Sequence, residues 1–462
     1  MTNYRPLHIL LVALLASGVL LVSPPEGTPA TAMAALALTV LIIGLMATSA
    51  IPEVQLAVLF FGLAVIFQIA PVDAVFSGFR SSAFWLVAGG IILGLAAEKT
   101  GLGTAVAGVL LRRMGQSFPQ VIIGLSIVAV ALALLIPAAL ARVIIMVPIV
   151  QAMADRVGFM PGSRGRKAML LTAIMVSFFV PMTILPSNFP NVLLAGMSDS
   201  LYGVNITYGL YLLMNFPVGG LLKGVFVIAI ICYFFGDRIK VDPDTVAQAP
   251  PAPLTAEGRR LAVIIVITVA LWAVDFVHGV APGWIAIGAA MTALLPGIGV
   301  MGVGDFRGRT GGFFAVFTVA TIIGIGAVLA ASGAGELIAA QLISATDFTP
   351  GHPAYTFSMF SAINIGMMLF ATVPGAIAVM APFAGTIAEA TEMPVLSVLM
   401  IIVNGYSTTF FPYQASPMLA GLRISGVSFA DGTKITFTVS AISLITILPL
   451  TYYWWRWLGY LN

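Results

Sequence analysis

The residues best suited to form a binding site lie in one apolar stretch, residues 131–150, which contains both Pro137 and Arg142. Proline removes a backbone donor and breaks a helix, and a bilayer tolerates the break only where protein or a water-filled cavity satisfies the freed groups. A charged side chain at that depth costs a further ~2.5–3.5 kcal/mol. The two costs together favour a binding site over a simple anchor. The alternative is a kinked helix from which Arg142 extends to the membrane surface.

Three more segments combine proline with polar side chains: residues 186–191, 372–376 and 407–417. A helix that restarts after such a break presents free N–H groups and a partial positive charge, which suit an anion. Asparagine, glutamine and hydroxyl side chains there would add directional hydrogen bonds, or would instead only satisfy the freed backbone. The candidate substrate-binding residues at the four breaks are Ala138, Ala139, Arg142, Ser187, Asn188, Asn191, Thr372, Gly375, Tyr413, Gln414 and Ser416.

The composition places these segments in a membrane. The 462 residues are 60% hydrophobic and only 8% charged, with a mean hydropathy of +1.09, whereas soluble domains carry about 25% charged residues. The single cysteine, Cys232, excludes a disulfide framework and a cysteine-based metal site. No HExxH, GxSxG or phosphate-cradling motif is present, so an ATP-driven pump is not expected. No nucleic-acid partner is expected either.

The apolar runs predict an all-α polytopic membrane protein with about 11 transmembrane helices and two re-entrant helical hairpins in an inverted repeat. Two runs are too long for one crossing and are broken by proline, which favours hairpins that enter and leave on one side. The predicted units are an N-terminal helix at 1–30; a first repeat at 31–236, with a hairpin at 119–155 and an interrupted helix at 168–197; a cytoplasmic linker at 237–260; and a second repeat at 261–462, with a hairpin at 353–391 and an interrupted helix at 394–421.

The distribution of basic residues predicts the orientation. With the N-terminus in the cytoplasm and both long runs treated as hairpins, most of the 20 lysines and arginines lie in cytoplasmic loops, as the positive-inside rule requires. If either hairpin were a single crossing, several basic loops would lie outside. We therefore expect a multi-pass protein of the bacterial inner membrane with its C-terminus outside.

The two halves of the chain also resemble each other. Residues 89–103 align with residues 321–335, and in both halves a hairpin and then an interrupted helix follow. An odd number of predicted crossings separates the copies, so the repeat is inverted. Inverted repeats whose broken helices meet at the midplane are typical of secondary transporters.

In this arrangement of hairpins and interrupted helices, the chain resembles the divalent anion:sodium symporter family, within the wider ion transporter superfamily. The resemblance rests on AFWLVAGGIILGLAAEKTGLG at 83–103, on Pro190-Asn191 after an unwound turn, and on residues 271–299. It implies a secondary active transporter of a small anion, such as a di- or tricarboxylate, sulfate or a related organic acid. It also implies an elevator-type mechanism and a homodimer in the lipid bilayer.

The family's hairpin tips carry Ser-Asn-Thr, which binds sodium and the substrate carboxylate. Anchored on Pro148, the first tip motif falls on Ala138-Ala139-Leu140; anchored on Pro382, the second falls on Thr372-Val373-Pro374. Most of the oxygen ligands that a hard cation needs are therefore missing. Arg142 stands at the place of a second threonine, where a guanidinium could replace the charge of sodium and pair with an oxyanion.

The resemblance leaves the coupling ion open. Sodium near Ala138 and Thr372 or a proton is expected, with no other cofactor. An ion or solute channel on the same scaffold is the alternative function. The GxGD pattern at 302–305 would suit an intramembrane aspartyl protease, but the second aspartate it needs is missing, because Asp275 is predicted near the opposite membrane face.

Overall fold

A computed structural model describes residues 5–25, 27–29, 31–48, 50–111, 117–136, 138–239, 254–307, 313–370 and 372–461. These residues form helices and connecting segments, with no β-strand among them. The prediction of an all-α membrane protein is confirmed. Helices suit such an apolar chain because each satisfies its own backbone groups without water.

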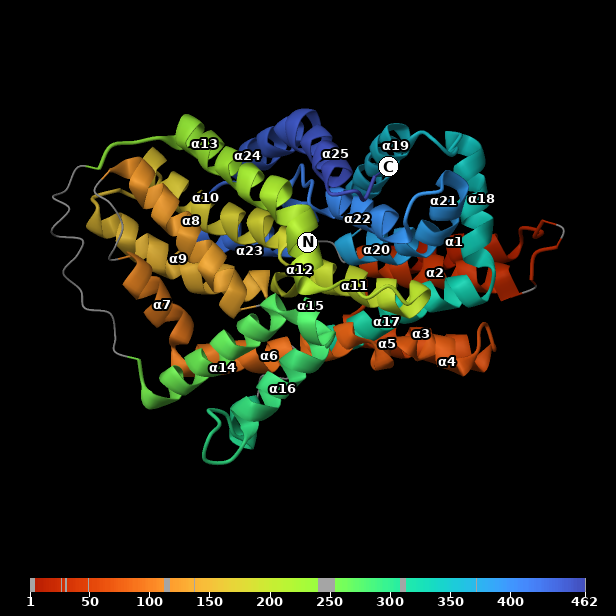
Figure 1. Cartoon of the computed structure of the whole chain (residues 1–462), viewed down its shortest axis with the longest axis horizontal. Helices are drawn as coiled ribbons and strands as arrows, with labels where there is room; N and C mark the ends of the chain where they lie inside the picture. The colour runs from red at the N-terminus through yellow and green to blue at the C-terminus, as the bar shows by residue number, and fades with distance from the viewer. Residues whose placement is uncertain are drawn as a thin grey trace.

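The first half of the chain contains thirteen labelled α-helices (Figure 1). Two 3₁₀ turns, Val180–Thr183 and Leu185–Ser187, separate α10 from α11, and a π-helical segment, Phe216–Leu222, joins α12 to α13. The helices are α1 (Arg5–Leu20), α2 (Thr31–Ala47), α3 (Glu53–Ile66), α4 (Val72–Val75), α5 (Ser77–Arg80), α6 (Ser82–Thr100), α7 (Leu102–Leu111), α8 (Phe118–Leu135), α9 (Ala139–Arg156), α10 (Arg164–Phe179), α11 (Phe189–Tyr202), α12 (Tyr208–Asn215) and α13 (Lys223–Phe235).

The second half repeats this pattern of long, paired and broken helices. A 3₁₀ turn, Ala381–Phe383, joins α20 to α21, another, Pro412–Gln414, precedes α23, and a π-helical segment, Ser443–Ile447, joins α24 to α25. The helices are α14 (Ala256–Ala273), α15 (Asp275–His278), α16 (Pro282–Leu294), α17 (Phe314–Ala331), α18 (Ala334–Thr346), α19 (Pro353–Phe370), α20 (Val373–Met380), α21 (Ala384–Thr391), α22 (Val395–Tyr406), α23 (Ser416–Ser425), α24 (Phe429–Ile442) and α25 (Leu448–Trp457).

The order of elements is the same in the two halves. The pair α6 and α7 corresponds to α17 and α18, the hairpin α8–α9 to α19–α21, and the broken helix α10–α11 to α22–α23. Each half ends in a long helix with a π-helical segment inside it. The inversion of the repeat remains a prediction, and residues 240–253 of the predicted linker lie outside the described residues.

Local sequence explains where these helices begin and end. The side chain of Ser81 accepts a hydrogen bond from the backbone N–H of Phe84 and so caps the start of α6. Gly101 ends the same helix with φ of 67°, a left-handed conformation that only glycine adopts without steric cost. These signals set the two ends of α6, which packs along α16.

Each hairpin packs against the broken helix of the other half. The second arm of the first hairpin, α9, lies beside α23, and α11 contacts α20 of the second hairpin (Figure 1). A Cβ atom at Gly421 in α23 would lie only 2.8 Å from Val143 of α9 and 2.9 Å from Ile174 of α10. The absence of a side chain at Gly421 therefore allows three half-helices to approach closely.

Six helical segments of the described residues are long and apolar enough to cross a membrane: Ser82–Thr100, Arg164–Thr183, Tyr208–Phe235, Phe314–Ala331, Val373–Thr391 and Phe429–Trp457. Several shorter apolar helices accompany them. The chain is thus an integral, multi-pass membrane protein. The predicted eleven crossings, the re-entrant course of the hairpins and the side on which each end lies remain predictions.

Cysteine labelling tests the orientation. In a Cys232→Ser background, we expect Met160→Cys to be labelled only from the cytoplasm and Thr349→Cys only from outside. Both native side chains are exposed, so the new thiols should be accessible. The measurement is labelling of intact cells by a membrane-impermeant maleimide, with permeabilised cells as the control. Labelling of Met160→Cys in intact cells would contradict the hairpin assignment for residues 119–155.

Candidate functional site

The first hairpin breaks where the sequence predicts, between α8 and α9. Helix α8 ends at Leu135, and α9 begins at Ala139 with Ala138 in extended conformation at its N-cap. Pro137 lies outside the described residues. Ala138 is exposed and Ala139 half-buried, and neither has a side-chain oxygen that could cap the helix or bind a cation. The start of α9 therefore presents only backbone N–H groups.

Arg142 lies one turn into α9 and is completely buried, with an exposed fraction of 0%. The alternative in which it extends to the membrane surface is therefore wrong. Its guanidinium donates four hydrogen bonds to protein oxygens, as a buried charge requires. Nη1 donates to the carbonyls of Ile136 and Ser187, both at 2.7 Å, and Nη2 to the carbonyl of Ser177 at 2.8 Å and to Oδ1 of Asn188 at 3.1 Å.

These bonds join the hairpin tip to the first broken helix. Ser177 lies in the last turn of α10, where carbonyls lack helical partners, and Asn188 occupies the N-cap position of α11 without a capping bond from its side chain. Ser187 adds a second link, because its hydroxyl donates to the carbonyl of Ala133 in α8 at 2.9 Å. The structure thus brings together Arg142, Ser187 and Asn188, which the sequence had singled out separately.

The interruption of this helix begins earlier than the predicted 186–191. Two 3₁₀ turns start at Val180, because Pro181 has no N–H for an α-helical bond, and α11 already begins at Phe189. Asn191 is completely buried, and its Nδ2 donates to the carbonyls of Pro181 at 3.1 Å and Ile184 at 2.9 Å. In this conformation Asn191 satisfies the freed backbone, which was the alternative to ligand binding.

Three buried polar atoms at this break have no hydrogen-bond partner among the described residues. They are the Nε of Arg142, the Nδ2 of Asn188 and the Oδ1 of Asn191. Buried polar groups are nearly always paired, so each orphan requires an explanation such as a bound water or ligand. The first two are donors and share one cluster, since Arg142 and Asn188 are hydrogen-bonded to each other.

The second half uses different side chains at the corresponding places. Thr372 caps α20, and its hydroxyl accepts a hydrogen bond from the N–H of Gly375 at 3.4 Å. Gly375 is buried, whereas Tyr413, in the 3₁₀ turn before α23, and Ser416, the first residue of α23, are exposed. Gln414 accepts from the N–H of Phe411 at 2.8 Å and caps the 3₁₀ turn before α23.

One contact is equivalent in the two halves. The Nε2 of Gln414 donates to the carbonyl of Met368 in the last turn of α19, at 2.6 Å. Ser187 makes the matching bond to Ala133 in the last turn of α8. Ser187 and Gln414 each lie two residues before the restarted helix, α11 or α23. Each broken helix is therefore attached to the first arm of its own hairpin by a side chain at the same position.

Lys223 is a functional candidate that is not among the residues predicted from the sequence. It is buried at the start of α13, its Nζ donates to the carbonyl of Ser407 at 2.5 Å, and it lies 5.1 Å from the ring centroid of Phe179. A lysine in an apolar run was the available signal, because a charged residue within the membrane indicates function. The four ion pairs formed by described residues include neither Lys223 nor Arg142.

A tyrosine pair connects the two interruptions. The hydroxyl of Tyr211 donates to the carbonyl of Met182 at 2.9 Å and lies 2.9 Å from the hydroxyl of Tyr406. Both rings are buried, and Tyr406 is the last residue of α22. The chain of bonds runs from the 3₁₀ turn of the first broken helix to the end of the equivalent half-helix in the second.

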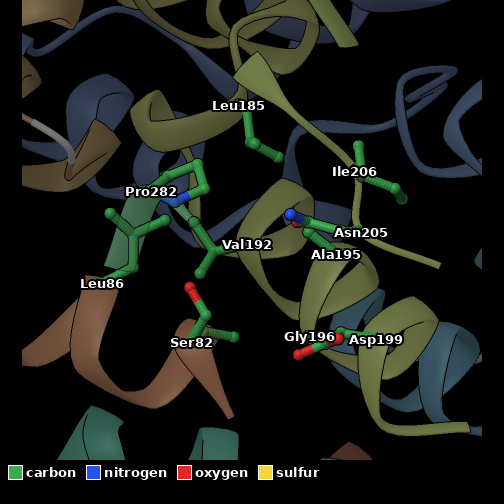
Figure 2. Close-up of a pocket in the computed structure, with 11 residues that line it drawn as sticks. Ser82, Leu86, Leu185, Val192, Ala195, Gly196, Asp199, Asn205, Ile206 and Pro282 are labelled. Atoms are coloured by element: carbon green, nitrogen blue, oxygen red, sulfur yellow. The ribbon is translucent and has the colours of Figure 1, made fainter. Parts of the chain in front are cut away.

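The pocket in Figure 2 lies between α6, α11 and the start of α16, and it touches the first interruption only through Leu185. Its only ionisable lining residue is Asp199, whose carboxylate would repel an anion. None of the predicted site residues lines it. We therefore place the candidate site at the breaks. The pocket is lined by Ser82, Ala83, Leu86, Leu185, Val192, Ala195, Gly196, Asp199, Asn205, Ile206 and Pro282.

Paired hairpins and broken helices that pack across two similar halves define a membrane transporter of the repeated, broken-helix class. The chain belongs to the family described as the sodium:sulfate symporter transmembrane region, whose model matches residues 2–461. The family resemblance predicted from the sequence is thereby confirmed.

Individual relatives are distant. A membrane protein of Cupriavidus necator is 25% identical over 394 residues, which cover 83% of this chain and 76% of the relative. An L-tartrate/succinate antiporter of Escherichia coli K12 is 24% identical over 369 residues, covering 74% and 72%. The solved structure of the Alcanivorax borkumensis YdaH transporter has a TM-score of 0.54 and 12% identity, and the match covers 94% of this chain and 99% of that one. The structural match supports the fold alone.

Proposed function

We propose that the chain is a secondary active transporter that moves a small anion across the bacterial inner membrane by elevator-type alternating access. The family and the relatives that are named as transporters support anion transport in general. The observation that carries the proposal is the pair of buried, unpaired donors at the first break, Arg142 Nε and Asn188 Nδ2. An anionic oxygen is the partner that both groups lack.

The electrostatics of the region favour an anion over a cation. Arg142 and Lys223 are buried positive charges without a carboxylate partner among the described residues. In a medium of low dielectric their field is weakly screened. The N-termini of α9 and α23 add partial positive charge, and these two helices meet at Val143 and Gly421, about one turn from where each begins.

A dicarboxylate is the substrate class we propose. The E. coli relative is named for L-tartrate and succinate, both small dianions, and two buried cations would balance one such dianion. Access to the buried donors requires the hairpin tip to move away from the broken helix. An elevator-type movement would then carry the occupied site across the membrane. A homodimer, as the family resemblance implies, would supply the fixed scaffold for that movement.

Ligand binding and counterflow test this function. We expect succinate or tartrate to raise the midpoint of thermal unfolding of the purified protein, because a ligand that binds only the folded state stabilises it by about 2.7 kcal/mol at 100 times its Kd. Chloride at equal ionic strength is the control. In proteoliposomes, internal unlabelled dicarboxylate should accelerate uptake of the labelled form. Unitary currents in a planar bilayer would instead identify the protein as a channel.

A further inference from the structure

The family name includes sodium, but the first hairpin tip does not fit a free sodium ion. Sodium is a hard cation that needs several oxygen ligands. Ala138 and Ala139 have no side-chain oxygen, and the carbonyl of Ile136 is already the acceptor of a hydrogen bond from Arg142. A positive charge already lies where the hairpin tip meets the broken helix.

The oxygens around the Arg142 guanidinium have the composition of a cation site. Three are backbone carbonyls, from Ile136, Ser177 and Ser187, and one is the amide oxygen of Asn188. They come from the hairpin tip, the end of one half-helix and the interruption itself. Carbonyls at unwound turns and at the C-terminal ends of half-helices are the groups that bind sodium in transporters with broken helices. Here the guanidinium donates to all four.

The second broken helix holds a cation in a related way. Ser407 follows the last residue of α22, and its carbonyl accepts from the Nζ of Lys223. The helix α22 corresponds to α10, whose last turn supplies the carbonyl of Ser177 to Arg142. Each of the two equivalent half-helices therefore ends against a side-chain cation, an arrangement that the negative end of the helix dipole stabilises.

We propose that Arg142 and Lys223 are covalently tethered cations that occupy the places of free coupling cations, so that this chain transports its anion without sodium. The inference rests on the proposed anion transport. A tethered charge remains at the site in every step of the cycle, whereas a free ion binds and leaves. Sodium would also be repelled from the carbonyls around Arg142 and from the carbonyl of Ser407 by the charge already present.

Sodium replacement in wild-type protein is the first test. At a fixed membrane potential, we expect dicarboxylate uptake to be unchanged when choline replaces sodium on both sides of the membrane. The thermal midpoint of the purified protein should also be the same in sodium chloride and choline chloride. A fall of roughly tenfold or more in uptake on sodium removal would overturn the inference. The thermal comparison needs no transport, so it still tests cation binding if the proposed function fails.

Chemical rescue is the second test. Arg142→Ala leaves four oxygens without a cation, so its thermal midpoint should fall and then rise again with guanidinium or sodium ions at millimolar concentration. Low concentrations of guanidinium should not raise the midpoint of the wild type or of Arg80→Ala, in which the lost side chain is exposed. An Arg142→Ala protein that folds and transports normally in choline would refute the role of this residue.

Lys223→Met keeps the test independent of whether Arg142→Ala folds. Methionine has a similar length and no charge, and it retains apolar contact with Phe179. We expect Lys223→Met to acquire a dependence of uptake on sodium or another monovalent cation. Uptake that is equal to that of the wild type in choline would exclude Lys223 as a tethered cation.

Discussion

Replacement of Arg142 by lysine is expected to lower the free energy of unfolding by about 2–5 kcal/mol and to remove most transport. The two terminal nitrogens of the guanidinium each bridge two oxygens, which lie on the hairpin tip, α10 and the interruption before α11. The shorter, compact ammonium of lysine cannot span these four acceptors. A lost hydrogen bond to a charged group costs about 1.5–3 kcal/mol, and the acceptors left behind are buried.

A control variant and a sodium measurement distinguish the loss of the four Arg142 bonds from a general effect of replacing arginine by lysine. Arg80→Lys is the matched control, because Arg80 is exposed and pairs with exposed Asp73 at 3.8 Å, an interaction worth about 0–1 kcal/mol. Chemical unfolding in detergent gives the stability of both variants. Because lysine keeps a positive charge, the residual uptake of Arg142→Lys should remain independent of sodium. Wild-type stability in Arg142→Lys would show that the four bonds contribute little.

Asn191→Asp is expected to destabilise the protein by about 2–4 kcal/mol, although the two side chains have the same shape. The Nδ2 of Asn191 donates to two buried carbonyls, of Pro181 and Ile184. A carboxylate oxygen at that position would face both carbonyls as an acceptor, and burial of the charge adds a further penalty. The 3₁₀ turns would lose the side chain that holds their geometry.

The pH dependence of Asn191→Asp checks the cause. A protonated aspartic acid can donate one hydrogen bond, so acidic conditions should restore part of the lost stability. Stability should rise as the pH falls, because burial disfavours the charged form of the new carboxyl group. Asn205→Asp is the control, because Asn205 is exposed. Equal stability of the two variants at neutral pH would mean that Asn191 is not essential for the interrupted turn.

Local signals made the breaks predictable. Proline in an apolar run and a charge beside it are visible without any structure, and the first hairpin breaks between the end of α8 at Leu135 and the start of α9 at Ala139. The boundary of the first interruption was less predictable, because two prolines have different effects. Pro181 lies where the helix ends, whereas Pro190 lies in the first turn of α11, a position that favours helix initiation.

The partners of the charged residues could not be predicted, because they depend on packing between distant segments. Arg142 donates to residues 35, 45 and 46 positions away, and Lys223 to a carbonyl 184 positions away. Sequence periodicity contains no information on such pairs. The same limit explains why Asn191, proposed as a ligand-binding residue, instead bonds with the backbone in this conformation.

The two buried cations have a consequence for how the membrane voltage acts on the protein. In an elevator-type movement that carries Arg142 and Lys223 across the membrane field, the empty protein moves two positive charges, and each costs about 2.3 kcal/mol per 100 mV against the potential. A bound dianion cancels both charges, so the loaded protein moves without an electrical cost. If the proposed movement occurs, a negative interior would retain the empty form facing inward, and the carrier would return outward mainly with a dianion bound. Net flux in one direction would then be slow, and one-for-one exchange of dianions would be the favoured cycle.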